Sequence, residues 1–519
     1  MDRTTAPTPN PMSITEISLG IIYGNVTSDE FRFAVQAERV TKGTFVKVNH
    51  DIFGWILGHI TGIERQTDLT FMEARNLFSN NTMEDKISDY HYSSNPRETP
   101  ELPDAGNVSA SVSILGYRDK RNVLQMPTTP LMAGKTVYLA ENDFIKSVIG
   151  LHASNETGAY LGLLKGHDLK ICLDINEMVQ KHISVIARTG SGKSYVVGVL
   201  VEELVEKEIP IVIIDPHGEY SSLIQPNLNY NDIKYMNDFG ITPKGYASNI
   251  TEYSIDSENA PGSIPLSFSG MNLEVDDILR LSGLKRTGSQ LGVLHKAIRI
   301  LSNSTEYYSI KDIIFQAELD RNNAKWNVIN AVERLDSYGL FSENPTPLGE
   351  IVKKGQCSVI NMKGVKPHIQ ELAVSLLIGS IFHKRKLDII PPVIVVVEEA
   401  HNYCPQKRTA ISSDILKSVA SEGRKFGLGL CIVTQRPARI DKNILSQCNT
   451  QIILRVTNPN DLKAIIASVE GLTARAANEI QRLPVGQALV VGANVEIPIY
   501  ANIRVRKSQH GGKSITIIE

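Results

Sequence analysis

The sequence predicts an α/β protein with an all-β domain at its N-terminus and a helical insertion in its α/β core. Three observations predict this fold. Short β-rich runs broken by Gly, Asn and Asp fill residues 14–165. From residue 166, runs rich in Val and Ile alternate with helical stretches, which is typical of a parallel sheet buried on both faces. Residues 271–341 interrupt that alternation with helical periodicity.

Length and composition exclude several classes of protein. A chain of 519 residues, 42% of them hydrophobic, exceeds what one compact core usually holds, so we expect more than one domain. The net charge of −2 argues against a protein that coats nucleic acid by bulk charge, but it allows a local basic surface. No charge-free apolar run reaches about 20 residues, so we expect no membrane helix. The five cysteines form no CxxC pair, which favours reduced thiols and a cytoplasmic location.

The N-terminal part reads as a flexible tail followed by a small β domain. Residues 1–13 are rich in Pro and Thr and lack the pattern of a secretory signal. In Val108–Ile114, apolar residues alternate with serines, and this period of two indicates a half-buried strand. Several short strands with turn signals favour a barrel or sandwich over residues 14–165. The polar stretch Ser79–Asp104 predicts a long mobile loop.

The α/β core is expected over residues 166–505. Its first strand, His182–Ala187, is followed by a helix at Lys193–Glu206. Later strands are expected at Ile211–Asp215, Cys357–Asn361, Val393–Glu398, Leu428–Thr434 and Gln451–Val456.

The insertion, at about residues 271–341, contains two sets of apolar residues with helical spacing, and each set would share one helix face. These residues are Leu291, Leu294, Ile298 and Leu301, and then Trp326, Ile329, Val332 and Leu335. The mainly polar residues 506–519 are expected to form a C-terminal tail.

A phosphate-binding loop lies at Ala187–Ser194, with the sequence ARTGSGKS between an apolar strand and a helix. Glycines let the backbone turn tightly and aim N–H groups at phosphate oxygens, and the helix N-terminus adds favourable charge. Lys193 would neutralise the β- and γ-phosphates, and Ser194 would ligate magnesium. Ala187 replaces the usual first glycine where the strand ends. We predict ATP and Mg²⁺ as cofactors, bound by Thr189, Gly190, Ser191, Gly192, Lys193 and Ser194.

Two adjacent carboxylates, Glu398 and Glu399, follow the apolar run Val393–Val397. Carboxylates at the C-terminal edge of a buried strand lie where ligands bind in open α/β sheets. Glu398 would hold magnesium, directly or through water, although the usual residue there is the shorter Asp. Glu399 would orient and polarise the attacking water. The alternative is a solvated strand end.

Asp215 and Glu219 close the next strand and would lie beside the nucleotide if that strand neighbours the phosphate-loop strand. The alternative is a simple turn formed by Asp215-Pro216-His217-Gly218.

Three further side chains are candidates for sensing or stabilising phosphate charge. Gln435 follows the strand Leu428–Thr434, and a polar residue at such a strand tip can sense the γ-phosphate; a strand-ending turn is the alternative. Arg424 could reach a neighbouring subunit's nucleotide in a ring, as arginine fingers do, or could lie on a solvated basic helix end. Arg455 is a second arginine candidate, with a buried pairing to a carboxylate as its alternative.

Taken together, these segments resemble the HerA family of DNA-translocating ATPases in the HerA/FtsK superfamily. The resemblance rests on Ala187–Ser194, Asp215–Glu219, Glu398–His401 and the block from Ser421 through Gln435 to Thr450. Shorter matches lie at Leu164–Asp168, Ile264–Leu266 and Leu483–Ala488, so that it covers nearly the whole chain.

The resemblance implies a hexameric RecA-like ring with an N-terminal HAS-type barrel. It implies ATP-driven translocation on double-stranded DNA, with a NurA-type nuclease docked at the barrel face during DNA end resection for recombinational repair. Family roles would fall on Lys193 and Ser194 for phosphate and magnesium, Glu399 for water activation, Gln435 for γ-phosphate sensing and Arg424 as a finger in trans.

Basic loops in the ring channel would contact DNA phosphates without reading sequence. Candidates in suitable loops are Lys363, Lys366, Lys407 and Arg408, although an ordinary solvated side chain is the favoured alternative for each.

Two other functions are compatible with a phosphate loop. One is a motor of conjugation or secretion, although such motors often carry membrane helices or partner-specific N-terminal domains. The other is a nucleotide-dependent scaffold that barely hydrolyses ATP, against which the presence of Glu399 argues.

Overall fold

The computed structural model describes residues 17–512 except 36–39, 67–106, 152–153, 155, 257, 259, 274, 276–277, 280–287, 306, 470–471, 473 and 494. The predicted N-terminal tail and the predicted loop Ser79–Asp104 lie outside the described residues. The chain divides into two compact units, Met1–Ile149 and Gly150–Glu519.

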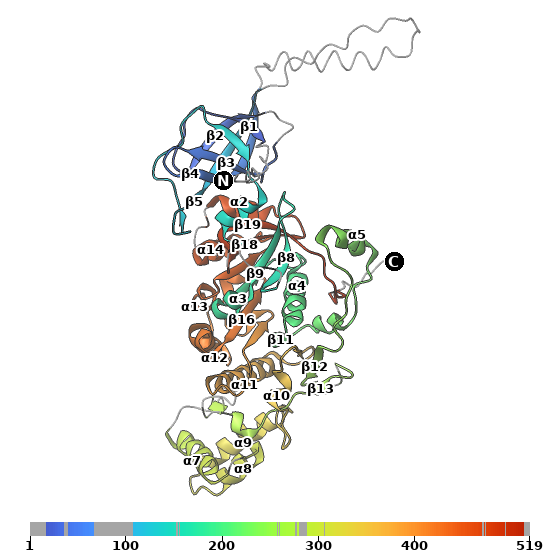
Figure 1. Cartoon of the computed structure of the whole chain (residues 1–519). Helices are drawn as coiled ribbons and strands as arrows, with labels where there is room; N and C mark the ends of the chain where they lie inside the picture. The colour runs from blue at the N-terminus through green and yellow to red at the C-terminus, as the bar shows by residue number, and fades with distance from the viewer. Residues whose placement is uncertain are drawn as a thin grey trace, which may run out of the picture. The chain divides into compact units, whose positions relative to one another are not determined.

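The N-terminal unit is a closed β-barrel, coloured blue to cyan in Figure 1. Its strands follow the order β2-β1-β7-β3-β4-β5-β6, and β2 also pairs with β5, which closes a ring of six. Alternate residues of β5, including Ala110 and Val112, are buried, as the period of two predicted. The elements are β1 Ser18–Tyr23, β2 Glu30–Val35, β3 Phe45–His50, β4 Gly54–Gln66, β5 Asn107–Arg118, β6 Leu124–Gln125, β7 Thr136–Leu139 and α2 Asn142–Ile149.

The C-terminal unit is built on one twelve-stranded sheet within the described residues, in the order β13-β12-β14-β11-β15-β16-β10-β17-β18-β19-β8-β9. Neighbours from β13 to β17 are parallel, and those from β17 to β9 are antiparallel. The strands are β8 Gly158–Leu164, β9 Lys170–Asp174, β10 Ile183–Ile186, β11 Ile211–Asp215, β12 Ile250–Ser254, β13 Ile264–Pro265, β14 Cys357–Asn361, β15 Val393–Val397, β16 Leu428–Thr434, β17 Thr450–Ile453, β18 Gln487–Gly492 and β19 Val495–Ile503.

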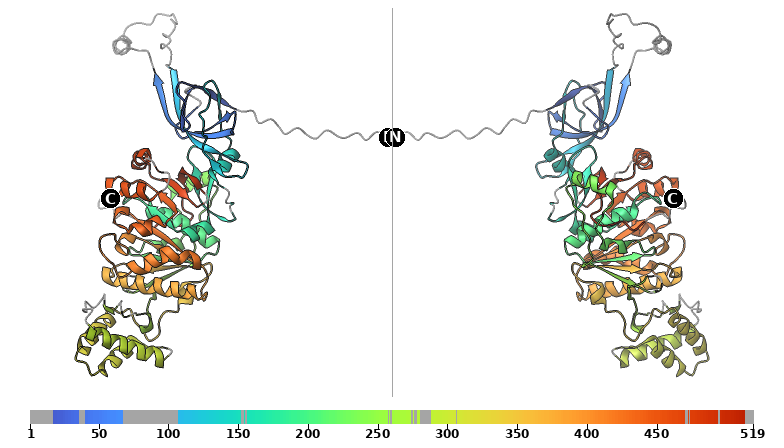
Figure 2. Two further views of the ribbon diagram at one scale, coloured as in Figure 1. Left: turned by 90° about the vertical axis from the view of Figure 1, so that its left-hand side faces the viewer. Right: turned by 90° about the vertical axis from the view of Figure 1, so that its right-hand side faces the viewer.

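Helices cover this sheet, as Figure 2 shows. Helix α4 contacts β8, β10 and β11, whereas α3 and α12 contact β16. The α-helices are α3 Ile175–Lys181, α4 Lys193–Glu206, α5 Tyr230–Phe239, α7 Gly288–Ser304, α8 Ile310–Glu318, α9 Lys325–Asp336, α10 Leu348–Ile351, α11 Pro367–Lys386, α12 Ser413–Glu422, α13 Lys442–Ser446, α14 Pro459–Ser468 and α15 Ala474–Gln481. Short 3₁₀ helices are η2 Tyr220–Ile224, η3 Gly270–Asn272, η4 Ala400–Asn402, η5 Gly423–Phe426 and η6 Pro437–Arg439.

The predicted insertion contains helices α7, α8 and α9, which group together beyond α11 in Figure 1. Buried residues of these helices, such as Leu294 and Val332, belong to the same apolar cluster as the sheet. Three of the residues expected on apolar helix faces are not fully buried: Leu291 and Ile298 are partly buried, and Trp326, at the start of α9, is 58% exposed.

Two expected boundaries differ from the structure. Strand β8 was expected in the N-terminal β domain, but it pairs with β19 and β9 in the large sheet, so this sheet begins before residue 166. Residues 506–512 were expected in a polar tail, yet Arg506 is only 1% exposed. Carboxylates on α4 neutralise this segment, which explains how so polar a sequence can be buried.

No helix among the described residues is both long and apolar enough to span a membrane.

Candidate active site

The phosphate loop lies at the C-terminal edge of the parallel strands. Its strand β10 lies between β16 and β17, and α4 begins at Lys193. Gly190 and Gly192 have φ angles of 73° and 91°, a left-handed conformation that L side chains rarely adopt. Ala187 is buried at the strand end, where its N–H donates to Thr434 O at 3.2 Å. Ala187 therefore belongs to the end of the strand, and the turn that follows is formed by Gly190 and Gly192.

Lys193 reaches from the first turn of α4 to both carboxylates that follow β15. Its Nζ lies 3.1 Å from Glu398 Oε2 and 2.5 Å from Glu399 Oε1. The two glutamates are only 3% and 6% exposed. Burial alone would lower the pKa of Lys193, but the two carboxylates outweigh it and the pKa is raised, so the ammonium stays charged. The phosphate-binding cation and the predicted catalytic acids therefore form one charge cluster.

Glu399 begins a tight turn and lies beside His401. Its φ of 47° is left-handed, and it precedes the short helix η4. His401 Nδ1 lies 3.2 Å from Glu399 Oε2 and 3.2 Å from Thr434 Oγ1. Burial lowers the pKa of His401, although the Glu399 charge opposes this, so the imidazole is neutral near pH 7.

Asp215 is not a neighbour of the phosphate loop. Strand β11 is separated from β10 by β15 and β16, so the condition for placing Asp215 and Glu219 beside the nucleotide is not met. The Asp215 carboxylate accepts hydrogen bonds from the N–H groups of His217, Gly218 and Tyr220 at 3.1, 2.8 and 3.0 Å. Burial raises the pKa of Asp215 to about 6, against these bonds. Asp215 therefore holds a turn, which was the alternative to a place beside the nucleotide.

The turn held by Asp215 presents Tyr220 to the site. The hydroxyl of Tyr220 donates to Glu398 Oε1, on the side away from the oxygen that pairs with Lys193. Glu219 is half-buried, and its backbone oxygen accepts from Ser222 Oγ at 3.0 Å. Tyr220 thus supports a candidate metal ligand through a hydrogen bond.

Gln435 is joined to the phosphate loop, because the Thr189 hydroxyl donates to Gln435 Oε1. Strand β16 lies between β10 and β15, so its tip is next to both the loop and the carboxylates.

The two candidate arginines lie at opposite ends of the parallel strands, and the backbone oxygen of Arg455 accepts from Arg188 N of the phosphate loop at 2.9 Å. Arg424 is exposed on η5, which precedes β16, and is therefore at the opposite strand end from Gln435. Arg455 is half-buried, and its Nε donates to Gln481 O at 3.1 Å, a backbone carbonyl instead of the carboxylate considered above.

The candidate DNA-contacting residues are all exposed: Lys363, Lys366, Lys407 and Arg408. Arg408 is already engaged, since it pairs with Glu371 at 2.8 Å and donates to Asn402 O at 2.9 Å.

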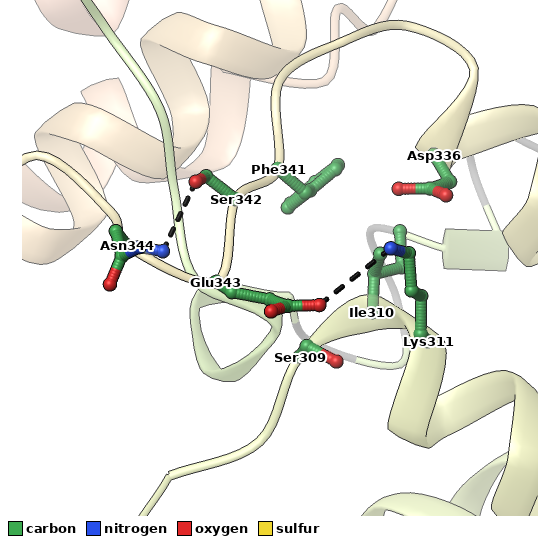
Figure 3. Close-up of a pocket in the computed structure, with 8 residues that line it drawn as sticks. All are labelled: Ser309, Ile310, Lys311, Asp336, Phe341, Ser342, Glu343 and Asn344. Atoms are coloured by element: carbon green, nitrogen blue, oxygen red, sulfur yellow. Dashed lines mark hydrogen bonds and ion pairs between the residues drawn. The ribbon is translucent and has the colours of Figure 1, made fainter.

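A separate pocket in the insertion, shown in Figure 3, contains none of these groups. Lys311 and Glu343 face each other there at 3.7 Å. The lining residues are Ser309, Ile310, Lys311, Asp336, Phe341, Ser342, Glu343 and Asn344. The residues that line this pocket include one ion pair and no part of the phosphate loop. We therefore take the cluster of Lys193, Glu398 and Glu399 as the candidate active site.

Comparison with known proteins shows what the chain is similar to. A family model described as "Helicase HerA, central domain" matches residues 159–381. The DNA double-strand break repair helicase HerA of Pyrococcus furiosus is 27% identical over 96% of each chain. HerA of Saccharolobus solfataricus is 28% identical over 93% of this chain and 92% of its own. The chain is thus similar to these HerA helicases over nearly its whole length. In addition, the structure of VirB4 of Thermoanaerobacter pseudethanolicus, at 13% identity and a TM-score of 0.50, covers 67% of this chain and 96% of its own; this likeness concerns the fold alone.

Tyr220 and His401 contact the site, yet no role for either was predicted from the sequence of this HerA-like chain. His401 could have been found, because it lies two positions after Glu399. Tyr220 offered none, since its contact with Glu398 spans 178 positions and depends on β11 lying beside β15.

Replacing Glu399 by Gln tests the site most simply. The amide keeps the side-chain shape but loses the charge that polarises water, so we expect ATP hydrolysis to fall by about 10²- to 10⁴-fold with ATP binding retained. The measurement is steady-state ATPase without DNA, together with nucleotide binding. Glu371→Gln, in a buried carboxylate on α11, is the matched control and should hydrolyse ATP like the parent. Equal turnover in Glu399→Gln and the parent would remove Glu399 from the reaction.

Proposed function

We propose that the chain is an ATP-driven ring translocase on double-stranded DNA that feeds a NurA-type nuclease in DNA end resection. The observation that carries this proposal is the cluster of Lys193, Glu398 and Glu399 at the sheet edge of a HerA-like chain. Two relatives aligned over more than nine-tenths of the chain are named DNA double-strand break repair helicases. The cluster supports ATP hydrolysis, and the names of the relatives support DNA as the substrate that is moved.

In this proposal the phosphates of ATP take Lys193 away from the two carboxylates. Glu399, which lies beside His401, is then free to orient a water molecule toward the γ-phosphate. Gln435, already bonded to Thr189, lies at the loop where it would sense that phosphate.

Magnesium fits the oxygen donors at this edge. The Ser194 hydroxyl and the Glu398 carboxylate are hard oxygen ligands of the kind that Mg²⁺ prefers. Bound there with ATP, the ion would neutralise charge on the phosphates. Tyr220 would orient Glu398 as such a ligand, because ligating carboxylates are usually held by a further hydrogen bond.

The remaining parts of the proposal concern assembly. Arg424 lies at the opposite end of the strands from Lys193, which supports a role at the nucleotide of a neighbouring subunit. Such a role requires a ring, and we propose six subunits from the resemblance to HerA. The exposed lysines Lys363, Lys366 and Lys407 would contact DNA phosphates, the barrel face would receive the nuclease, and the assembly would work in the cytoplasm. The likeness to VirB4 concerns the fold alone, so it adds no support for a secretion or conjugation motor.

Duplex DNA should stimulate the enzyme. We expect a native mass of several subunits and an ATPase rate that rises severalfold on adding linear duplex DNA, because a translocase couples turnover to its track. Native mass spectrometry and steady-state ATPase with and without DNA measure both. A monomer in the presence of nucleotide, with a rate indifferent to DNA, would overturn the proposal.

Mixing two inactive variants tests the shared site. Arg424→Ala should lose about a thousandfold in turnover, as loss of an arginine finger does, and Lys193→Ala should lose nucleotide binding. In mixed rings, some interfaces pair an intact Lys193 with an intact Arg424, so the mixture should hydrolyse ATP faster than either variant. A mixture no faster than the sum of its parts would place Arg424 outside the neighbour's site.

A further inference from the structure

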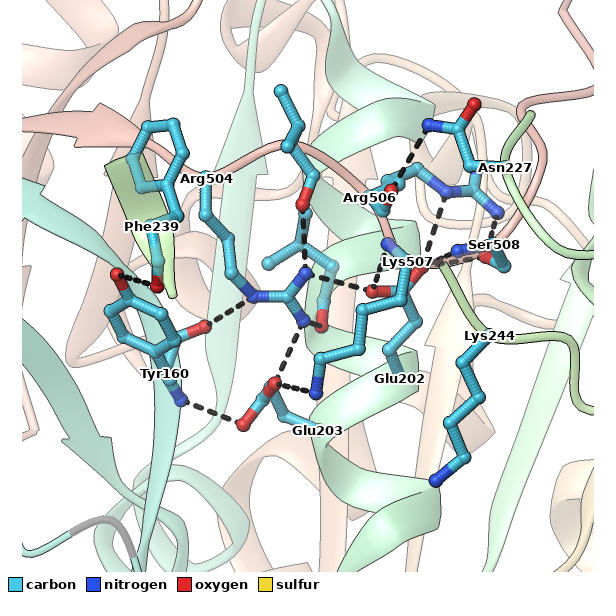
Figure 4. A network of polar contacts seen from close by, with 12 residues as sticks. Tyr160, Glu202, Glu203, Asn227, Phe239, Lys244, Arg504, Arg506, Lys507 and Ser508 are labelled. Carbon is cyan, nitrogen blue, oxygen red and sulfur yellow. Dashed lines mark hydrogen bonds and ion pairs between the residues drawn. The ribbon is translucent and has the colours of Figure 1, made fainter. Parts of the chain in front are cut away.

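The segment Arg504–Gly512, here called the C-terminal clamp, follows β19 and lies along helix α4 (Figure 4). Two buried arginines point from it toward carboxylates on α4. Arg504 donates from Nη1 to Glu202 Oε2 and from Nη2 to Glu203 Oε1, both at 2.8 Å. Arg506 Nε lies 3.6 Å from Glu202 Oε1. The clamp is therefore attached to the same helix that begins with Lys193.

Glu202 is the centre of this attachment. Besides Arg504, it accepts from Lys507 N at 3.1 Å, from Ser508 N at 2.8 Å and from Ser508 Oγ at 2.6 Å. Lys507 Nζ extends the network to Glu203 at 3.0 Å and Glu206 at 2.7 Å. Three cations thus face three carboxylates, and buried charges of this kind require their partners. The register between clamp and helix is consequently fixed.

Helix α4 makes room for Arg506 at Gly198. A Cβ at that position would lie 2.6 Å from Arg506 Cζ, well inside van der Waals contact. Glycine in a helix interior costs stability relative to alanine, so its presence there has a packing reason.

The other side of the clamp is bonded to the chain that follows β11. The N–H groups of Asn227 and Lys244 both donate to Lys507 O at 2.9 Å. Ser222 Oγ donates to Gln509 O at 3.0 Å. Ser222 belongs to η2, whose first residue, Tyr220, donates to Glu398. The clamp therefore joins the helix that carries Lys193 to the turn that holds a carboxylate paired with it.

The clamp also contacts the first turn of α4. The Tyr195 hydroxyl accepts from the backbone N–H of Arg506 at 2.8 Å, and the Arg506 guanidinium lies over the Tyr195 ring, with Cζ 5.9 Å from the ring centroid. The Tyr195 ring also meets the His510 ring edge-on at 5.4 Å between centroids. Tyr195 directly follows Ser194, so this contact is one residue from a predicted phosphate-site side chain.

We propose that the C-terminal clamp positions the phosphate-loop helix for nucleotide, with Arg506 as a positioning residue that acts through Tyr195. This inference rests on the proposed function, in that nucleotide is the ligand. Helix α4 is held at its first turn and in its middle, so the clamp keeps Lys193 and Ser194 in place relative to Glu398. Displacement of a positioned group by about 1 Å can cost as much as 10²-fold, which sets the scale of the effect.

Two substitutions test the clamp in the full chain. Arg506→Met keeps a long side chain without the charge, and Tyr195→Phe removes only the hydroxyl. For both we expect the KM for ATP and the Kd for fluorescent mant-ADP to rise together, by about fivefold to 100-fold, with kcat changing less. Arg506→Lys restores the charge, and it should recover part of the affinity.

The matched control is Arg118→Met in the N-terminal barrel. Arg118 donates to the backbone oxygens of Ser147 and Val148 at 2.9 and 2.7 Å, so its loss should lower the melting temperature and leave KM and Kd unchanged. A purely structural role for Arg506 would give the same pattern, because fewer folded molecules lower the apparent kcat but not the affinity. KM and Kd within twofold of the parent in both Arg506→Met and Tyr195→Phe would therefore overturn the proposal.

The binding assay separates this proposal from the proposed function. A parent chain that binds mant-ADP but does not hydrolyse ATP would contradict the translocase, while the change in Kd would still decide the clamp.

Discussion

The buried pairing of Lys193 with Glu398 and Glu399 is the contact on which the rest of the site depends. Removing one partner of a buried ion pair typically costs about 3–5 kcal/mol, because the other charge is left uncompensated. In the proposed function, the phosphates of ATP would offer Lys193 negative charge in the same place. The carboxylates released by this exchange would be the ones that hydrolysis requires, so binding and activation would be coupled through one side chain.

Strand order makes this coupling possible. Parallel strands β10, β16, β15 and β11 deliver the phosphate loop, Gln435, the two glutamates and Asp215 to one edge of the sheet. The Asp215 turn then carries Tyr220 to Glu398, and the C-terminal clamp links the following chain back to helix α4. The site is therefore supported by contacts between segments that lie far apart in the sequence.

Local patterns predicted the parts of the site that depend on spacing along the chain. The phosphate loop and the pair Glu398 and Glu399 were predictable because each is a short run next to an apolar strand, and the α/β core, the barrel and the insertion followed from periodicity. The position of Asp215 could not be predicted, since it depends on which strands are neighbours. Arg506 looked like a solvated tail residue because the carboxylates that neutralise it lie about 300 positions earlier on α4. The assignments to DNA, magnesium and the neighbouring subunit remain predictions.

The exchange of partners by Lys193 can be observed directly. The measurement is a structure of the full chain with Mg²⁺ and a non-hydrolysable ATP analogue, determined by cryo-electron microscopy. We expect Lys193 Nζ to leave both carboxylates and to lie about 3 Å from a phosphate oxygen, with Glu399 facing the γ-phosphate. A bound analogue beside a Lys193 that is still paired with Glu398 and Glu399 would contradict it.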